Sequence, residues 1–397
     1  MLQYSPIMAA SQTPGRPCMR CKKPDAAFEL RNVATCQDCF IDYVDSKAVK
    51  RFTVLQRETR ASTKPEPRRY VAGLSFGPSS TVLTQILDKT AQYHASRKGS
   101  SPFEPLIVHI DTDLSLSLSA RTDSHDTPAQ RLLAKYRERF PNVSFECVHL
   151  SKVLGVRTID WTTIPVPEGK NDAERLQLFF ASLPSVTSRA DSLRLFIRHL
   201  LLDVAIQRSY SALLFGHSTT ALAALTLSEV ANGRGFAVPW QINDGLFTVC
   251  TYRPSADPAS TGDASQEDAK TQFPIYYPLR EILKAEVVTY LGTTPAVQEL
   301  VPSADGASSS VVSHKDQSIE EVMARYFDGV EGPYSGIVTN VVRTAGKLDR
   351  LVTLHYCRLC GVTLDQEGDS TWAGELGDDL VQDTGKLCYG CKRSMGG

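Results

Sequence analysis

The segment Y-V-A-G-L-S-F-G-P-S-S, residues 70–80, decides the fold class, because an apolar run is followed at once by a serine, glycine and proline loop. The run 70–74 predicts a buried strand, and a helix is expected from about residue 79 to residue 97. Such a turn exposes backbone N–H groups, and the helix N-terminus adds the positive end of its dipole. The segment therefore marks a place where an α/β sheet can bind phosphate, although a plain tight turn has the same composition.

Further strands and helices alternate along the middle of the chain. Apolar runs predict strands at 106–111, 143–150 and 212–216, and periodic segments predict helices at 128–140 and 191–210. Additional helices are expected at about 40–57, 278–291, 318–327 and 334–347. The alternation predicts a parallel sheet covered on both faces, with ligands bound at the carboxyl ends of the strands.

Eight of the ten cysteines form four C-x-x-C pairs, namely Cys18/Cys21, Cys36/Cys39, Cys357/Cys360 and Cys388/Cys391. Two thiolates at this spacing fit adjacent corners of a zinc tetrahedron, and four complete a structural site with no position open for catalytic water. We predict two structural Zn²⁺ sites, one near each end of the chain. A pair from one end could also share a metal with a pair from the other end.

Composition excludes several classes of protein. With 42% hydrophobic and 22% charged residues among 397, the chain is not wholly disordered. No apolar run approaches 18 residues, so no membrane association is expected. The N-terminus lacks the basic and apolar regions of a secretory signal. We therefore expect a cytoplasmic, reducing compartment, where paired cysteines bind metal more readily than they form disulfides.

Charge is distributed unevenly although the net charge is −1. Residues 16–69 contain 13 Lys and Arg against 7 Asp and Glu, a balance of +6, whereas residues 365–383 contain seven acidic and no basic residues. A basic surface beside a metal module can contact nucleic-acid phosphates, although an ordinary solvated surface has the same charges. The candidate contacts are Lys22, Lys23, Lys50 and Arg51, together with Arg194 and Arg198, which lie one turn apart on the predicted long helix.

The chain divides into five predicted parts. A disordered tail, 1–15, precedes a zinc module and basic helix, 16–60. After a linker at Lys64–Arg69 comes an α/β domain, 65–300, with a disordered insertion at about 254–272. A loop and helical segment, 301–350, leads to a zinc ribbon, 351–397.

Two Cys₄ modules around such an α/β domain resemble the tRNA thiolation enzymes of the PP-loop, or adenine nucleotide α-hydrolase-like, superfamily. The segment L-L-F-G-H-S-T-T-A-L-A-A-L-T-L-S-E-V-A-N-G-R-G-F, residues 213–236, followed by Y-P-L-R at 277–280 and K-A-E at 284–286, looks like the cytoplasmic tRNA 2-thiolation protein 2 family. The resemblance implies a parallel-sheet PP-loop domain. It also implies a subunit of the eukaryotic wobble-uridine tRNA thiolase.

The sequence departs from the catalytic members of that superfamily at the phosphate loop. Their PP-loop reads S-G-G-x-D-S, and this chain reads S-F-G-P-S-S at residues 75–80. Phe76 replaces a glycine and is expected to crowd the phosphate, and Ser79 replaces the acidic residue. We therefore predict weak or absent ATP binding. The resemblance implies a degenerate nucleotide site made of Ser75, Gly77, Ser79, Ser80 and His217.

The sequence also lacks the active-site cysteines of those relatives. Their C-x-x-C pair corresponds to residues 188–192, where this chain has none, and Cys147 and Cys250 are expected in the core. The resemblance thus implies a chain with no catalytic residue. It would form a heterodimer with a catalytic PP-loop subunit that thiolates tRNA(Lys), tRNA(Glu) and tRNA(Gln) with sulfur from a ubiquitin-like carrier. The alternatives are an ATP-using enzyme in its own right and a zinc scaffold or adaptor without an RNA role.

Overall fold

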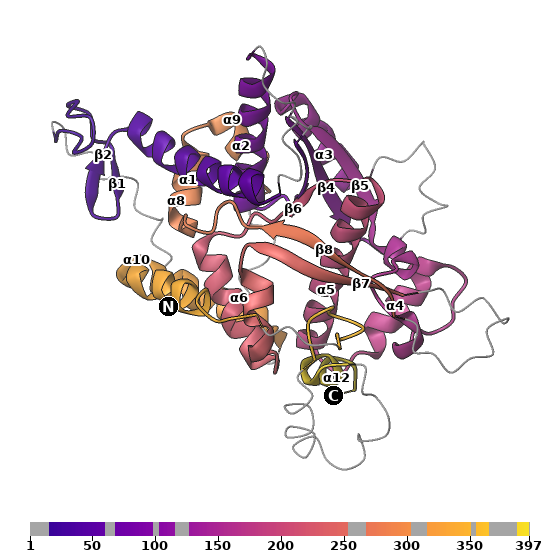
Figure 1. Ribbon diagram of the computed structural model, residues 1–397. Coiled ribbons are helices and arrows are strands. Elements are labelled where there is room, and N and C mark those ends of the chain that lie inside the picture. The colour runs from indigo at the N-terminus through magenta and orange to yellow at the C-terminus, as the bar shows by residue number, and fades with distance from the viewer. Residues whose placement is uncertain are drawn as a thin grey trace.

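The computed structural model describes residues 16–59, 68–97, 103–115, 127–252, 267–302, 316–350, 355–364 and 387–396. Its centre is a six-stranded sheet in the order β5-β4-β3-β6-β8-β7 (Figure 1). The strands are β3 Arg68–Gly73, β4 Phe103–Asp111, β5 Ser144–His149, β6 Ala212–Leu214, β7 Gly245–Tyr252 and β8 Glu267–Tyr276. All neighbours are parallel except β7 and β8. The expected α/β class is therefore confirmed.

Successive residues of a strand point to opposite faces of the sheet, so both faces carry apolar side chains. Helices cover both faces. Tyr70 and Ala72 pack under α1 Gln37–Glu58, α2 Pro78–Ala95, α3 Pro128–Arg139 and α8 Lys284–Gly292, whereas Val71 packs under α5 Val186–Gln207 and α6 Thr219–Ala231. Shorter elements complete the two layers. They are α4 Asp172–Ser182, α7 Val238–Ile242, α9 Pro295–Gln298 and three 3₁₀ segments, Leu150–Gly155, Trp161–Thr163 and Gly235–Ala237.

The N-terminal module consists of a hairpin followed by α1. Strands β1 Phe28–Leu30 and β2 Val33–Thr35 pair in antiparallel register. Arg31 and Asn32 both have positive φ, 50° and 66°, as a two-residue primed turn requires. Cys36 then occupies the N-cap of α1, so the hairpin delivers two cysteines to the start of the helix.

Two predicted boundaries at the end of the α/β domain were wrong. The helix expected from residue 278 begins only at Lys284, because Pro278–Ile282 forms a turn held by Thr219, which donates from N to Ile282 O and from Oγ1 to Arg280 O. Residues 267–272, assigned to a disordered insertion, belong to β8, where β7 pairs with them. The rest of that insertion lies outside the described residues.

Two further boundaries need correction. Arg68 and Arg69, assigned to the linker, begin β3. The two helices expected at 318–327 and 334–347 are one kinked element, α10 Ile319–Ala345. Its kink lies at Tyr334, with φ −138° and ψ 48°, directly after Pro333, which lacks the N–H that the helix needs.

The C-terminal segment packs into the α/β domain beside α5. A bridge joins Tyr356 to Thr363, and α12 Tyr389–Gly396 follows. The tail 1–15 and the acidic loop 365–383 lie outside the described residues. Among the helices that the structure describes, none has the length and apolar character that crossing a bilayer demands.

Candidate functional site

A cavity of about 850 Å³ lies at the carboxyl ends of β3, β4 and β6. All five residues expected in a degenerate nucleotide site line it, namely Ser75, Gly77, Ser79, Ser80 and His217. Arg194 and Arg198 of α5 and the first turns of α10 line the same cavity. The fold thus brings together residues from four distant segments at the sheet edge where parallel α/β proteins bind ligands.

Phe76 does not crowd this cavity, contrary to the expectation from sequence. Its φ of 60° places the side chain on the far side of the loop, where the ring is 8% exposed. The ring centroid lies 4.2 Å from that of His109 and 5.3 Å from that of Tyr136. Phe76 is therefore part of the core beneath the loop.

Hydroxyl groups of the loop satisfy its own backbone. Ser80 Oγ accepts a hydrogen bond from Ser75 N at 3.2 Å and donates to Gly77 O at 3.0 Å. Ser75 Oγ accepts from Gly77 N at 3.4 Å. Two N–H groups that a phosphate could otherwise use are thus occupied by serine oxygens of the same loop.

Gly216 allows the end of β6 to approach the loop. A Cβ at this position would lie 2.9 Å from Ser80 Cα and 3.1 Å from Ser80 N, and both are backbone atoms that cannot yield. Glycine is therefore required here for the close contact between β6 and the N-terminus of α2.

Arg194 is only partly exposed, with 20% of its side chain accessible, and three carboxylates neutralise it. Its Nε donates to Glu320 at 2.7 Å, and its Nη2 donates to Asp191 at 2.9 Å and to Glu229. Burial alone would raise the pKa of Asp191, but the charges of Arg234 and Arg194 hold that pKa below its ordinary value. The guanidinium group of Arg194 therefore bridges α5, α6 and α10 rather than lying on an outer surface.

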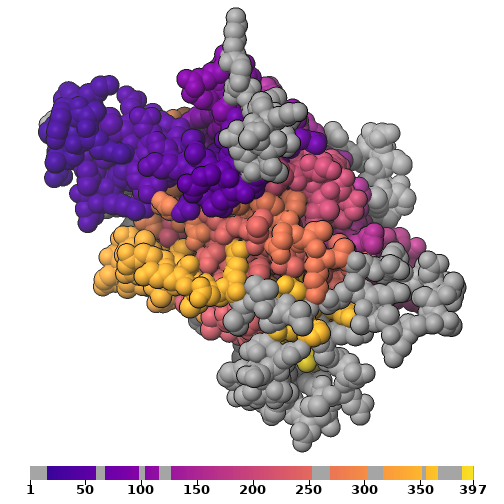
Figure 2. Space-filling model, in the orientation of Figure 1, coloured from indigo at the N-terminus to yellow at the C-terminus, as the bar shows by residue number. Residues whose placement is uncertain are grey.

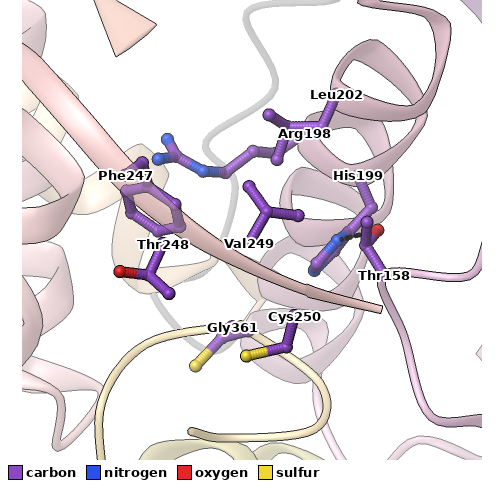
Figure 3. Close-up of a pocket in the computed structure, with 10 residues that line it drawn as sticks. Thr158, Arg198, His199, Leu202, Phe247, Thr248, Val249, Cys250 and Gly361 are labelled. Atoms are coloured by element: carbon purple, nitrogen blue, oxygen red, sulfur yellow. Dashed lines mark hydrogen bonds between the residues drawn. The ribbon is translucent and has the colours of Figure 1, made fainter. Parts of the chain in front are cut away.

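Arg198 is inside the protein, with 7% of its surface exposed. Its guanidinium carbon lies 4.8 Å from the ring centroid of Phe247, and both side chains border a second cavity of only about 10 Å³ (Figure 3). Burial and then the charges of Arg198 and Arg194 lower the pKa of His217 to about 4. The imidazole of His217 is therefore neutral at pH 7. Neither arginine presents the outward charge that the sequence suggested for contact with tRNA.

The eight paired cysteines form two separate clusters, which settles the pairing that the sequence left open. Cys18, Cys21, Cys36 and Cys39 gather at the N-terminal module, and Cys357, Cys360, Cys388 and Cys391 gather at the C-terminal segment, with sulfur atoms within 4.8 Å of one another in each cluster. Both donor sets fit a metal ion that prefers four thiolates.

In the N-terminal cluster, the pKa values of the four thiols are spread widely. Backbone N–H groups of Cys21 and Cys36 lower the pKa of Cys18 to about 6, whereas burial and the three other thiols raise the pKa of Cys39 to about 12. The four thiols therefore resist joint deprotonation. A divalent cation would stabilise all four thiolates at once.

The C-terminal cluster is joined to the core rather than forming a detached ribbon. All four of its cysteines are 1% exposed or less and pack with α5 and α6 in one hydrophobic cluster. Arg234, fully buried, has Nη1 3.9 Å from Cys391 Sγ and donates from Nε to Glu229 at 2.9 Å. Ser394 donates to Asp191 at 2.9 Å. A continuous polar network thus runs from this cluster to Arg194 at the cavity.

The three lysines expected to contact RNA are exposed, whereas Arg51 is not available. Lys22, Lys23 and Lys50 lie on the surface of the N-terminal module, and Lys23 Nζ lies 3.6 Å from a carboxylate oxygen of the exposed Asp38. Arg51 forms ion pairs with Asp244 at 3.3 Å and with Glu281. It holds α1 against the α/β domain.

Comparison with known proteins identifies the family. The model of a family described as cytoplasmic tRNA 2-thiolation protein 2 matches residues 318–383. A protein of that name from Sclerotinia sclerotiorum is 35% identical over 355 residues, 87% of each chain, and one from Phaeosphaeria nodorum is 33% identical over 95% of this chain and 94% of its own. The chain belongs to the cytoplasmic tRNA 2-thiolation protein 2 family.

The fold of this tRNA 2-thiolation protein 2 family member is shared with a solved structure. The U34-tRNA thiolase NcsA from Methanococcus maripaludis, solved with its [4Fe-4S] cluster, superimposes with a TM-score of 0.50 at 15% identity, covering 90% of this chain and 96% of that one. At this identity the likeness establishes the architecture alone.

Sequence reasoning missed several residues of the cavity in this family member. Glu320, Gln241 and Tyr277 line it, yet they come from a helix, a short helix and a strand end that carry no recognisable motif. The only available signal was Tyr277, the first residue of the Y-P-L-R segment that supports the family resemblance.

Proposed function

We propose that this chain takes part in 2-thiolation of the wobble uridine of cytoplasmic tRNA(Lys), tRNA(Glu) and tRNA(Gln) as a non-catalytic subunit. Membership of the cytoplasmic tRNA 2-thiolation protein 2 family supports the reaction and a cytoplasmic location. One observation supports the non-catalytic role most directly. Of the described residues that line the large cavity, none is a cysteine.

Sulfur transfer requires a thiolate nucleophile or a set of cluster ligands. The first turns of α5, where catalytic relatives of the superfamily carry cysteines, here supply Ser188, Asp191 and Ser192, all buried. Cys147 lies in β5 and Cys250 in β7, and neither lines the large cavity. The chain thus offers no sulfur chemistry at the place where the fold would use it.

The metal is proposed to be zinc at both clusters. Four cysteine ligands in a tight group are typical of structural Zn²⁺ sites, and the C-terminal set is closed to solvent. Cys357, Cys360, Cys388 and Cys391 would hold the ion that fixes the end of the chain to α5. The N-terminal set would hold the hairpin to α1.

The N-terminal module is the proposed contact for tRNA. Lys22, Lys23 and Lys50 are exposed there, and lysine contacts to phosphate supply affinity independent of sequence. The module projects from the body of the molecule on the same face as α10 (Figure 2).

An exposed apolar surface on α10 is the proposed contact for the partner subunit. Helix α10 exposes Val322 and Tyr326, one turn apart, Tyr334 at its kink and Ile337 beyond it. Exposed apolar side chains grouped on one element favour contact with another protein chain. We assign this surface to the catalytic PP-loop subunit of a heterodimer, which would receive sulfur from a ubiquitin-like carrier.

Reconstitution tests the proposal. The chain is co-expressed with candidate catalytic PP-loop subunits, the complex is identified by mass analysis, and 2-thiouridine is measured in the three tRNAs. Thiolation should require both chains and should persist in a Ser79→Ala variant, because Ser79 takes no part in chemistry. Loss of thiolation in that variant while the complex stays intact, or ATP-dependent pyrophosphate release by this chain alone, would contradict the non-catalytic role.

A further inference from the structure

Helix α10 carries Gly329, Gly332, Pro333 and Gly336 close to its kink at Tyr334. A Cβ added to any of these three glycines would meet no atom within 4 Å, and none of the three has a positive φ. Neither packing nor backbone conformation therefore requires glycine at these positions. Glycine inside a helix is less favourable than alanine, because ordering its backbone costs more conformational entropy. The composition of this segment thus favours bending at the expense of helix stability.

The two halves of α10 are held on the core to different degrees. The half after the kink has three buried apolar side chains, at most 7% exposed, namely Val338, Val342 and Ala345. In the half before the kink, Phe327 is the one apolar side chain buried to this extent, at 1% exposed. Met323 and Val330 beside it are only partly buried. Apolar contact therefore holds the first half less firmly than the second.

Glu331 fixes the middle of the helix between these halves. The residue is 6% exposed, and its carboxylate accepts hydrogen bonds from Ala285 N at 2.6 Å and from Thr220 Oγ1. Thr220 Oγ1 in turn accepts from Lys284 N at 3.0 Å. Glu331 thus joins α10 to the N-termini of α6 and α8, where the helix dipoles favour a carboxylate. A firmly bonded residue beside a flexible segment has the properties of a pivot.

The first half is also held by two ion pairs that lie partly in solvent. Glu320 accepts from Arg194 Nε at 2.7 Å, and its side chain is 27% exposed. Asp328 pairs with Lys284 at 2.6 Å, and both side chains are more than 40% exposed. Ion pairs with this access to water contribute little to stability. Arg194 keeps two other carboxylates when Glu320 leaves, so the first half can separate without leaving an unpaired cation behind.

We propose that residues 319–328 form an arm that swings about the segment 329–336, with Glu331 as the pivot, while residues 338–345 stay on the core. Such a hinge absorbs the change of φ and ψ within a few residues and leaves the helical parts on either side intact. The exposed apolar residues of the arm, Val322 and Tyr326, then change position relative to Ile337 on the second half. A partner chain that contacts both halves fixes the angle between them. This last step rests on the proposed function, whereas the movement of the arm does not.

Electron-spin distance measurements on the free full-length chain test the movement. A spin label is attached to a ketone-bearing amino acid, so that the ten cysteines stay unmodified. It is placed at Arg325 on the arm or at Asn340 on the second half, which are both exposed and lie similarly far from Pro333. A second label at Gln207, exposed at the end of α5, is the common reference. The distance distribution from the arm should be about twofold wider than that from the second half, because only the arm moves.

Stiffening the hinge should narrow the distribution from the arm. Gly329→Ala, Gly332→Ala and Gly336→Ala are combined in one chain, which should fold because each added methyl group enters open space. The width for the arm should approach that for the second half. Gly155→Ala is the matched control, since a Cβ there also meets no atom within 4 Å but the residue lies outside α10. It should leave both widths unchanged.

Releasing the far end of the arm should have the opposite effect. Glu320→Gln weakens the contact with Arg194 and should widen the distribution from the arm without changing that from the second half. Glu104→Gln is the control, because it removes the carboxylate of a surface pair with Arg69 at the start of the sheet. This control should leave both distributions as they are in the wild type.

Two results would overturn the proposal. The first is that the two labels give equal widths in the wild-type chain, which would mean that α10 moves as a single body. The second is that the glycine and Glu320 variants both keep the wild-type width for the arm. Binding of the catalytic subunit should narrow the distribution from the arm. A complex that forms while the arm keeps its full width contradicts the role of the partner and leaves the movement itself standing.

Discussion

Arg31, at the turn of the N-terminal hairpin, donates from Nε to Glu286 Oε1 at 2.8 Å, although 255 residues separate the two along the chain. Its Nη2 also reaches the carbonyl of Glu281 at 2.9 Å. Glu286 in turn accepts from Leu283 N and so caps α8. The hairpin beside the first cysteine cluster is therefore attached to the α/β domain through the start of this helix.

Arg31→Ala should lower the free energy of unfolding by about 1 kcal/mol, because it leaves the buried carboxylate of Glu286 without its cation while the arginine itself is partly screened by solvent. Urea unfolding measures the change. Lys23→Ala is the matched control, since its pair with Asp38 is fully at the surface and should contribute less than about 0.5 kcal/mol. Equal effects of the two substitutions would show that the hairpin is not attached in this way.

Removing the two metal clusters should have unequal consequences. Cys357→Ser with Cys360→Ser should release one zinc and lower the Tm of the whole α/β domain, because these sulfurs lie in its core. Cys18→Ser with Cys21→Ser should also release one zinc but should lower the Tm by less, since Cys21 is exposed and Cys39 is only partly buried. Metal analysis and calorimetry distinguish the cases. Full metal content in either variant would show that its cluster is not a metal site.

Charge reversal of Lys22, Lys23 and Lys50 should weaken tRNA binding by the assembled complex and flatten its salt dependence. Removing one lysine–phosphate interaction reduces the slope of log K against log salt by roughly 0.7–0.9, so the slope of the triple variant should fall by up to about 2 to 3. Lys135→Glu, on the exposed surface of α3, is the control. An unchanged slope in the triple variant would favour a scaffold without an RNA role.

Aspartate at Tyr326 and Ile337 should separate this chain from its catalytic partner, because each substitution places a charge in an apolar contact. Co-purification and size-exclusion chromatography measure the complex. Tyr93→Asp changes a similarly exposed aromatic residue on α2 and should leave the complex intact. A stable complex with both α10 substitutions would place the partner elsewhere.

His217 should make the protein less stable in acid. Its pKa in the folded state is about 4, below the ordinary value of about 6.5 that it regains on unfolding, so the unfolded state binds the proton more tightly. The contribution is present above pH 6.5 and is lost as pH falls towards 4, by up to about 3 kcal/mol. Burial is the largest cause of this shift, and the charges of Arg198 and then Arg194 add to it; Glu320 and Glu321 line the same cavity.

His217→Phe should remove that part of the acid limb, as measured by urea unfolding from pH 7 to pH 4. An acid limb identical to that of the wild type would mean that His217 is protonated in the folded state as readily as in the unfolded state.

Features that depend on a local sequence pattern could be predicted. C-x-x-C spacing identified the cysteines that gather in two clusters, and the strand, loop and helix at residues 70–97 located the edge of the sheet that carries the cavity. The side chain of Phe76 was misplaced, because only the fold reveals a φ of 60° that turns the ring towards His109.

Contacts between residues that are far apart in the sequence could not be predicted. Arg194 appeared to be a surface cation because Glu229 and Glu320 lie 35 and 126 residues away. Arg51 appeared free for the same reason, since Asp244 is 193 residues away. Residues 267–272 looked too polar for a strand, and their conformation depends on pairing with β7 at the edge of the sheet.

The location of the C-terminal cluster has a consequence for biosynthesis. Cys388 and Cys391 complete a set of ligands that belongs to the same core as β3 and α5, which are translated long before them. Until the ribosome has made residue 391, that core lacks part of its wall and the ion lacks half of its ligands. If this set binds the proposed zinc, the chain acquires the ion only after most of its synthesis is finished. A premature stop codon before Cys391 should yield a product that quality control removes.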